Sequence, residues 1–589
     1  MKYPFPKQAI QAWLVLVALL LLAPVTTQGQ RRIATREADQ HYQTGMQLLE
    51  KQELDQAIAE LSLATKLKPK FASAYNSLGL ALARKGEINA AGESFRKAIQ
   101  INPRFYEAQL GLASVLQQAG DFDAAIVAAK RATALKPGEV EARLLQGAAY
   151  QQKGDLNSAI AQFREAVQVK PAAAEAHSYL GFALGVKGQL QDSISEFEMA
   201  VKLKPDLGQA QYYLGAARWF SNDVEGAIAA LRSAVKLMPK DVNAHYYLGR
   251  ALQKSGNLED AISEFDTAIK LAPDMIEARR AMGLALQQNE DLDAAIEAFR
   301  AVIKLKPDFV EAHNDLGLAL VQKRDPEAAI IEFNNVLSRD PNDLAANHNL
   351  GMTLIQKGDY AAAVTQYQKL IALMPGDAEA HYNLGLALKH RDALKEAITE
   401  LRQATVLNPS LQEAHYALGV ILLQQSNFDE AAAAFRAAIE VKKNYAEAHY
   451  ALGTVLQQKG DLVGAIEAFR EALKFAPNAA EIHNTLGNAL RQKGDVEAAR
   501  AEFQEAARLN KIRSNQQAAM FATNTGLAHL KDGKLDAAVE RFQAAIQLDP
   551  TNGQAYYNLA RALQQKGETE AARAAYQKAK ELNPRRAKQ

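Results

Sequence analysis

A glycine that recurs every 34 residues constrains the fold of this chain more than any other feature. It stands at the equivalent position in 14 of 16 copies, and Ala113 and Ala560 replace it in the other two. An alanine 12 residues further on recurs in every copy except one, where Ser193 takes its place. Of the 18 prolines, 14 stand where a copy ends. A fixed period of this length predicts a stack of identical supersecondary units, each of which buries its apolar face against its neighbours.

The copy 446–479 shows what one unit is built from. Its first half, Glu447 to Lys459, has apolar or small residues at helical spacing and stops at Gly460, a residue that favours helix C-termini. Asp461 is positioned to cap a second helix, which Pro477 ends because proline lacks the amide proton. The sequence therefore predicts a helical hairpin in every copy.

These motifs resemble the tetratricopeptide repeat (TPR) family, which has a Leu-Gly pair in its first helix and a spaced Ala, Phe, Ala and Pro in its second. The resemblance implies an all-α fold, a right-handed superhelical α-solenoid of about 16 helix-turn-helix repeats. It also implies a scaffold that binds protein or peptide partners in a groove lined by the first helices. The array is similar to the repeat portion of O-linked N-acetylglucosamine transferases, but it lacks their catalytic domain.

The register of the repeats divides the chain. Fourteen copies run without insertion over residues 38–513, and two more occupy 519–584. Between them, residues 514–518 form a five-residue insertion, which we expect to be a hinge or a longer loop. Arg500 and Arg573 replace an apolar second-helix residue in the 14th and 16th copies, which is typical of a repeat that no successor covers. A lead-in, 30–37, and a polar tail, 585–589, flank the array.

Residues 1–29 have the pattern of a secretory signal peptide. Lys2 and Lys7 precede an apolar run, Trp13 to Ala23, and small residues follow before Gln30. We therefore expect export, to the periplasm or outside the cell. The alternative is an uncleaved membrane anchor over residues 9–25, although the apolar core is short for a span. Membrane contact is expected only through this segment, if it is not cleaved.

Composition excludes several functions. The formal net charge is +1, so no basic field for nucleic acid is present. There are no cysteines, which excludes disulfides and thiol chemistry. We find no catalytic motif outside the repeats, and therefore predict no enzyme activity, catalytic residue, cofactor or small-molecule substrate.

Eight of the 11 histidines occupy the fourth position of a repeat. A metal site is not expected, because each helix contributes only one imidazole and packed helices lie about 8–10 Å apart. Tyr75 and Tyr556 hold the same position, so packing between helices is the simpler interpretation.

The partner-binding prediction rests on repeat positions that line the groove in the TPR family. The sixth copy is unusual there, because Trp219 and Phe220, preceded by Arg218, stand where other copies often have Gln-Gln. Aromatic residues beside an arginine are typical of interface hot spots. The predicted binding residues are Arg218, Trp219, Phe220, Tyr212, Tyr246, Phe182, Val186, Tyr382, Tyr416 and Tyr450.

Three functions fit these observations. The first is an exported, non-enzymatic interaction scaffold. The second is a substrate-recruiting subunit of a separate glycosyltransferase, although only Asn349, Asn383, Asn524 and Asn558 match that family's asparagine ladder. The third is a structural or assembly factor of the cell envelope.

Overall fold

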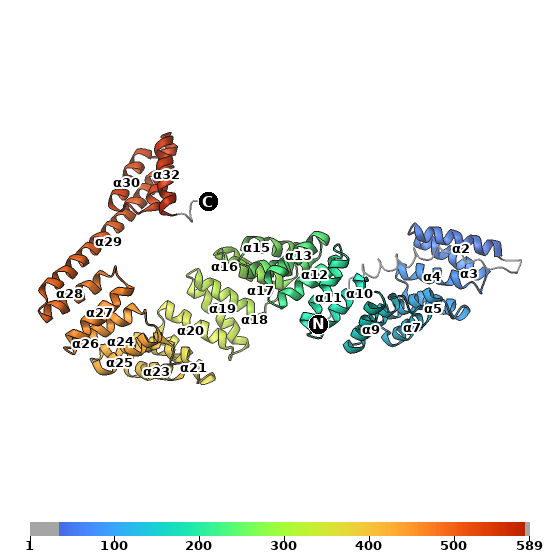
Figure 1. Cartoon of the computed structure of the whole chain (residues 1–589), viewed down its shortest axis with the longest axis horizontal. Coiled ribbons are helices and arrows are strands. Elements are labelled where there is room, and N and C mark those ends of the chain that lie inside the picture. Colours follow the sequence, from blue (N-terminus) through green and yellow to red (C-terminus); the bar gives the residue numbers. More distant parts are fainter. Residues whose placement is uncertain (1–34, 584–589) are drawn as a thin grey trace. The chain divides into compact units, whose positions relative to one another are not determined.

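The computed structural model describes residues 35–583, in which 31 α-helices and no β-strands are found (Figure 1). The leader, most of the lead-in, Pro584 and the polar tail lie outside the described residues. Those that are described fall into two compact units, one ending at Asp315 and the other beginning at Leu316. No helix within residues 35–583 combines the length and apolarity that a membrane span requires.

The helices alternate as the period predicts. The first helices of the repeats are α2 (Thr35–Glu50), α4 (Ala72–Lys85), α6 (Tyr106–Gln118), α8 (Glu141–Gln152), α10 (Ala174–Val186), α12 (Gly208–Phe220), α14 (Val242–Lys254), α16 (Ile276–Gln288), α18 (Val310–Gln322), α20 (Leu344–Lys357), α22 (Ala378–His390), α24 (Gln412–Gln424), α26 (Ala446–Gln458), α28 (Ala480–Lys493) and α31 (Gly553–Lys566).

The second helices are α3 (Leu54–Leu67), α5 (Ile88–Ile101), α7 (Phe122–Leu135), α9 (Leu156–Val169), α11 (Leu190–Leu203), α13 (Val224–Leu237), α15 (Leu258–Leu271), α17 (Leu292–Leu305), α19 (Pro326–Arg339), α21 (Tyr360–Leu373), α23 (Leu394–Leu407), α25 (Phe428–Val441), α27 (Leu462–Phe475), α30 (Leu535–Leu548) and α32 (Thr569–Leu582). The remaining helix, α29 (Val496–Lys531), contains both the second helix of the 14th repeat and the first helix of the 15th.

The turn inside each hairpin depends on two residues whose roles the sequence predicts. Gly460 has a φ of 82°, a left-handed conformation that costs glycine little and ends the first helix. The Asp461 side chain accepts a hydrogen bond of 2.9 Å from the amide of Gly464, which confirms it as the N-cap of α27. Pro326 begins α19, as predicted, at a position where its missing amide proton costs nothing.

The core of most repeats lies between the two helices of the repeat and the first helix of the next one. Most second helices pack against the first helix on either side, as α9 packs against α8 and α10. Phe265 is fully buried against the helix that carries Gly249, where a Cβ atom would lie only 2.6 Å from the phenyl ring. The recurrent glycine is therefore required by close helix packing.

The five-residue insertion does not form a loop. Residues 510–518 lie inside α29, which continues without a break from Val496 to Lys531 (Figure 1). Lys511 stands where most repeats have a helix-ending proline, and the segment 496–525 contains no glycine or proline. Nothing in this segment stops the helix. The loop alternative is therefore wrong, whereas a hinge within the helix stays a prediction.

Candidate partner-binding surface

Two aromatic residues, Trp219 and Phe220, lie at the end of α12 next to α14. The Phe220 side chain is 60% exposed. Its ring lies edge-on to Trp219, with 5.0 Å between centroids, and 6.0 Å from the ring of Tyr247. Trp219 and Tyr247 are themselves 6.1 Å apart. These three rings hold one another in place, so that Phe220 presents an exposed aromatic surface on a rigid support. We call Trp219, Phe220 and Tyr247, with Tyr212 and Tyr246, the aromatic cluster.

Arg250 on α14 completes this surface. Its guanidinium lies 5.1 Å from the centroid of the Trp219 ring and 5.8 Å from that of Tyr246, distances at which cation–π attraction contributes about 0.5–2 kcal/mol. Nη1 also donates a hydrogen bond of 2.9 Å to the hydroxyl of Tyr246. The Trp219 indole Nε1 is buried without a hydrogen-bond partner. Sequence reasoning missed Arg250 and Tyr247, although the 34-residue period places both on the first helix of the next repeat.

Tyr212 supports the cluster from α12. Its ring lies 6.1 Å from that of Tyr247 and 5.2 Å from that of Tyr213. Burial raises the pKa of Tyr212 and raises the pKa of Tyr213 to about 12, so both hydroxyls stay neutral at physiological pH. These residues provide apolar contact area and neutral hydroxyl groups.

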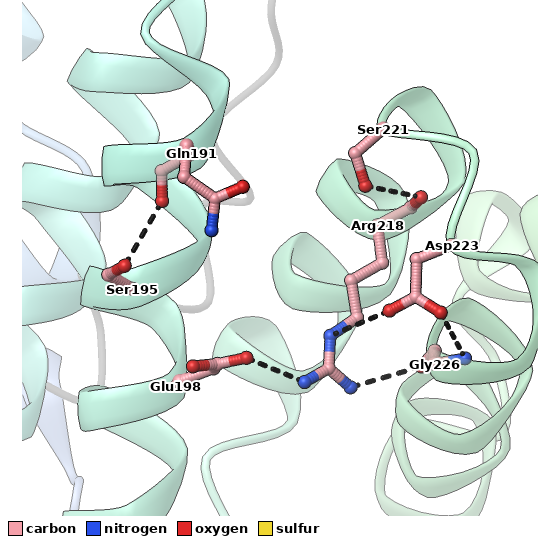
Figure 2. A network of polar contacts seen from close by, with 7 residues as sticks. All are labelled: Gln191, Ser195, Glu198, Arg218, Ser221, Asp223 and Gly226. Atoms are coloured by element: carbon pink, nitrogen blue, oxygen red, sulfur yellow. Dashed lines mark hydrogen bonds and ion pairs between the residues drawn. The ribbon is translucent and has the colours of Figure 1, made fainter.

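Arg218, one of the predicted binding residues, bonds to groups within the array (Figure 2). Nη2 donates a hydrogen bond of 2.7 Å to Oε1 of Glu198 on α11, and Nε lies 3.6 Å from Oδ2 of Asp223 at the start of α13. Nη1 reaches the carbonyl oxygen of Gly226 at 3.4 Å. Arg218 therefore ties three helices together, because all of its nitrogen atoms face acceptors within the array.

Phe182 and Val186 lie on α10, in the preceding repeat. The Phe182 ring packs 4.9 Å from Tyr213, which connects it to the interior of the array. Val186 is 40% exposed at the end of its helix. The structure thus brings Trp219, Phe220, Tyr212 and Tyr246 together, and places Phe182 beside Tyr213.

Comparison with protein families covers most of the repeats. A tetratricopeptide repeat model matches residues 144–208, 212–276, 280–343, 386–450, 416–480 and 450–518, more than half of the chain. The chain belongs to the tetratricopeptide repeat family. A TPR repeat model matches 351–390 and 526–567, a second tetratricopeptide repeat model matches 553–586, and the middle TPR-like domain of cilia and flagella-associated protein 70 matches 64–170.

Solved structures of three proteins are similar to parts of the chain. MamA is 27% identical and covers 28% of this chain and 96% of its own, with a TM-score of 0.28. YrrB, described as a TPR protein with an unusual peptide-binding site, is 23% identical, covers 32% of this chain and 98% of its own, and has a TM-score of 0.29. Yeast Tom70 is 17% identical, covers 72% and 96%, and has a TM-score of 0.31. No curated protein sequence matches the chain.

The other three predicted tyrosines lie on separate TPR helices of the second unit. Tyr416 and Tyr450 each place their rings 5.7 Å from the core phenylalanine of the same repeat. Tyr382 is half-buried on α22, and burial raises its pKa and that of Tyr416. These tyrosines contribute to the TPR core as well as to the first-helix surface.

The recurrent TPR histidines bond to groups within the array. In five repeats Nδ1 lies 2.6 Å from a glutamate oxygen on the second helix, as between His177 and Glu196. In most of these, Nε2 also faces the carbonyl oxygen of the proline before the repeat, as with His177 and Pro171. Within residues 35–583, no group of three or more potential ligands is placed to hold a metal ion. The contacts agree with a packing role for these imidazoles.

Proposed function

We propose that this TPR chain is a non-enzymatic interaction scaffold that binds protein or peptide segments on the surface of its first helices. The aromatic cluster is the anchor site. The exposed ring of Phe220, supported by Trp219 and Tyr247, is the observation that carries this proposal. Aromatic side chains beside an arginine dominate the binding energy of many interfaces.

Glutamine side chains support the proposal because they offer polar contacts along the same helices. Gln253 donates a hydrogen bond of 3.1 Å to Gln288 of the next repeat, and Gln457 donates one of 3.0 Å to Gln492. All four residues are exposed or partly exposed, and each amide has further donor or acceptor capacity. An extended peptide presents donors and acceptors of the same kind.

The experiment is selection of peptides from a random display library, with the TPR array as bait. We expect selected peptides with an apolar or aromatic side chain that bind wild type and lose about tenfold or more in affinity for Phe220→Ala. Gln118→Ala is the matched control, since Gln118 has the repeat position of Phe220 in the third copy and is exposed. Peptides that bind both variants equally would contradict the proposed anchor site at Phe220. Failure to select any peptide would count against the scaffold function.

Export remains part of the proposal because of the basic start and apolar run within residues 1–29. Mass spectrometry of the protein isolated from cell fractions tests it. A mature N-terminus near Gln30 in an extracytoplasmic fraction supports export with cleavage. An intact Met1 in the membrane fraction would favour the anchor, and an intact Met1 in the cytosol would exclude both.

A further inference from the structure

The junction between the 14th and 15th repeats is made by one helix instead of two. At most other junctions the second helix of one repeat packs against the first helix of the next, as α27 packs against α28 and α30 against α31. At this junction both segments belong to α29. Because a continuous helix cannot fold back on itself, the two surfaces that normally cover each other are separated along its length.

The first of these surfaces contains Phe503. Outside the last repeat, all other aromatic residues at its repeat position are buried: Phe95, Phe163, Phe197, Phe265, Phe299, Phe333, Tyr367, Phe435, Phe469 and Phe542. Phe503 is only partly buried, although it packs against its own first helix at Gly487. The missing cover is the next first helix, which elsewhere contributes residues such as Tyr179, whose ring lies 5.5 Å from that of Phe163.

The second surface contains Phe521. The equivalent residue is a fully buried alanine in the second to thirteenth repeats and in the sixteenth, where it packs against the preceding repeat. Phe521 is 75% exposed, and Asn524 and Ala528 on the same side of α29 are also exposed. A phenyl ring at this position does not fit the close junction that alanine allows, which argues against closure of the junction within one chain.

The two surfaces share one side of α29. Phe503 and Phe521 are 18 residues apart, which is five turns at about 3.6 residues per turn, or roughly 27 Å along the axis. Ala507, Ser514 and Gln517 follow the same line between them, so no charged residue interrupts it. The midpoint of the line is residue 512.

We propose that α29 is a self-association helix. Two copies of the chain pair their α29 helices antiparallel about a two-fold axis near residue 512, so that Phe521 of one copy covers Phe503 of the other. A second copy is the occupant that the structure favours, because its α29 contains the first helix of a repeat. In other internal repeats, a first helix of this kind covers the aromatic residue equivalent to Phe503. A two-fold arrangement covers both phenylalanines of both chains with a single contact.

The flanking charges give the association a distinctive salt dependence. Lys511 and Arg513 lie on either side of the uncharged line close to the midpoint, where each approaches its own counterpart in the second copy. Such like-charge pairs oppose association, and added salt screens them. The dimer therefore strengthens as the salt concentration rises.

Analytical ultracentrifugation of the full chain tests the proposal. We expect a concentration-dependent dimer whose dissociation constant rises about tenfold or more in Phe521→Lys. Val463→Lys is the matched control, since Val463 on α27 is also an exposed apolar residue, and this variant should dimerise like wild type. Both substitutions are on the surface, where effects on stability are small. A monomer at every concentration and salt level would overturn the proposal, and so would equal loss in the two variants.

Cross-linking tests the antiparallel arrangement. The chain has no cysteine, so single cysteines can be placed at will. Residues 507 and 517 are symmetric about residue 512. A mixture of Ala507→Cys and Gln517→Cys chains with different tags should form disulfides mainly between unlike chains. Equal yields of like and unlike pairs would contradict the antiparallel arrangement.

Discussion

Nδ1 of His245 lies 2.6 Å from Oε2 of Glu264, and Nε2 of the same ring lies 3.1 Å from the carbonyl oxygen of Pro239. His245 is on the first helix of its repeat and Glu264 on the second, whereas Pro239 ends the preceding repeat. The imidazole thus joins three segments of the array. His177, His381 and His483 make the same pair of contacts.

We predict that His245→Ala lowers the local free energy of unfolding by about 1.5–3 kcal/mol, because it removes a hydrogen bond to a charged group and leaves the partly buried Glu264 carboxylate without this partner. His415 provides the control. Its Nε2 contacts the carbonyl oxygen of Pro409, but the position equivalent to Glu264 is occupied by Ala434, which offers no carboxylate. His415→Ala should therefore cost only about 0.5–1.5 kcal/mol. Hydrogen exchange of the helices on either side measures both, and equal losses would contradict the role assigned to the glutamate.

Gly249→Ala should destabilise the seventh repeat by about 1–3 kcal/mol, because the new Cβ atom would lie 2.6 Å from Phe265 and force the two helices apart. Denaturant unfolding followed by hydrogen exchange in α14 and α15 measures the effect. Gly138→Ala is the control, since a Cβ atom there meets nothing within 4 Å. If Gly249→Ala left the free energy of unfolding unchanged, the helix pair would be able to widen without cost.

Arg218→Met should weaken the contacts between α11, α12 and α13 while leaving the aromatic cluster able to bind. The substitution retains the aliphatic stem but removes the ion pairs with Glu198 and Asp223, which are partly exposed and together contribute about 1 kcal/mol. Faster hydrogen exchange in these helices, with unchanged affinity for peptides that require Phe220, is the expected result. A loss of affinity as large as that of Phe220→Ala would show that Arg218 contacts the partner directly.

Features that recur with the 34-residue period could be predicted from the sequence. The contacts of residues that occur in a single copy could not. Gly460 and Asp461 could be assigned because local backbone conformation and capping decide their roles. The ion pair of Arg218 could not be predicted, because Glu198 lies 20 residues away and only the packing of the helices brings its carboxylate within reach. Arg250 was missed for the same reason, since its partner Trp219 is in the preceding repeat.

The insertion shows a different limit. Its length marks a break in register, but register alone does not distinguish a loop from a continuing helix. The absence of glycine and proline from 496–525 was the available signal, and it favours the helix that the structure contains.

The middle of α29 should open more readily than any other second helix of the array. No side chain from 510 to 518 is buried, whereas Ala465, Ile466, Ala468, Phe469 and Ala472 of α27 are. Without packing, a helical segment of this length has only its backbone hydrogen bonds, which are marginal in water. Amides of 511–518 should therefore exchange faster than those of 464–473, by about tenfold or more.

Exchange measured at low protein concentration, where the chain is monomeric, isolates this property. An increase in the protection of 511–518 with protein concentration would report pairing of α29. Equal protection of the two segments at all concentrations would show that the helix needs no support, and would remove the physical basis for a hinge at this point.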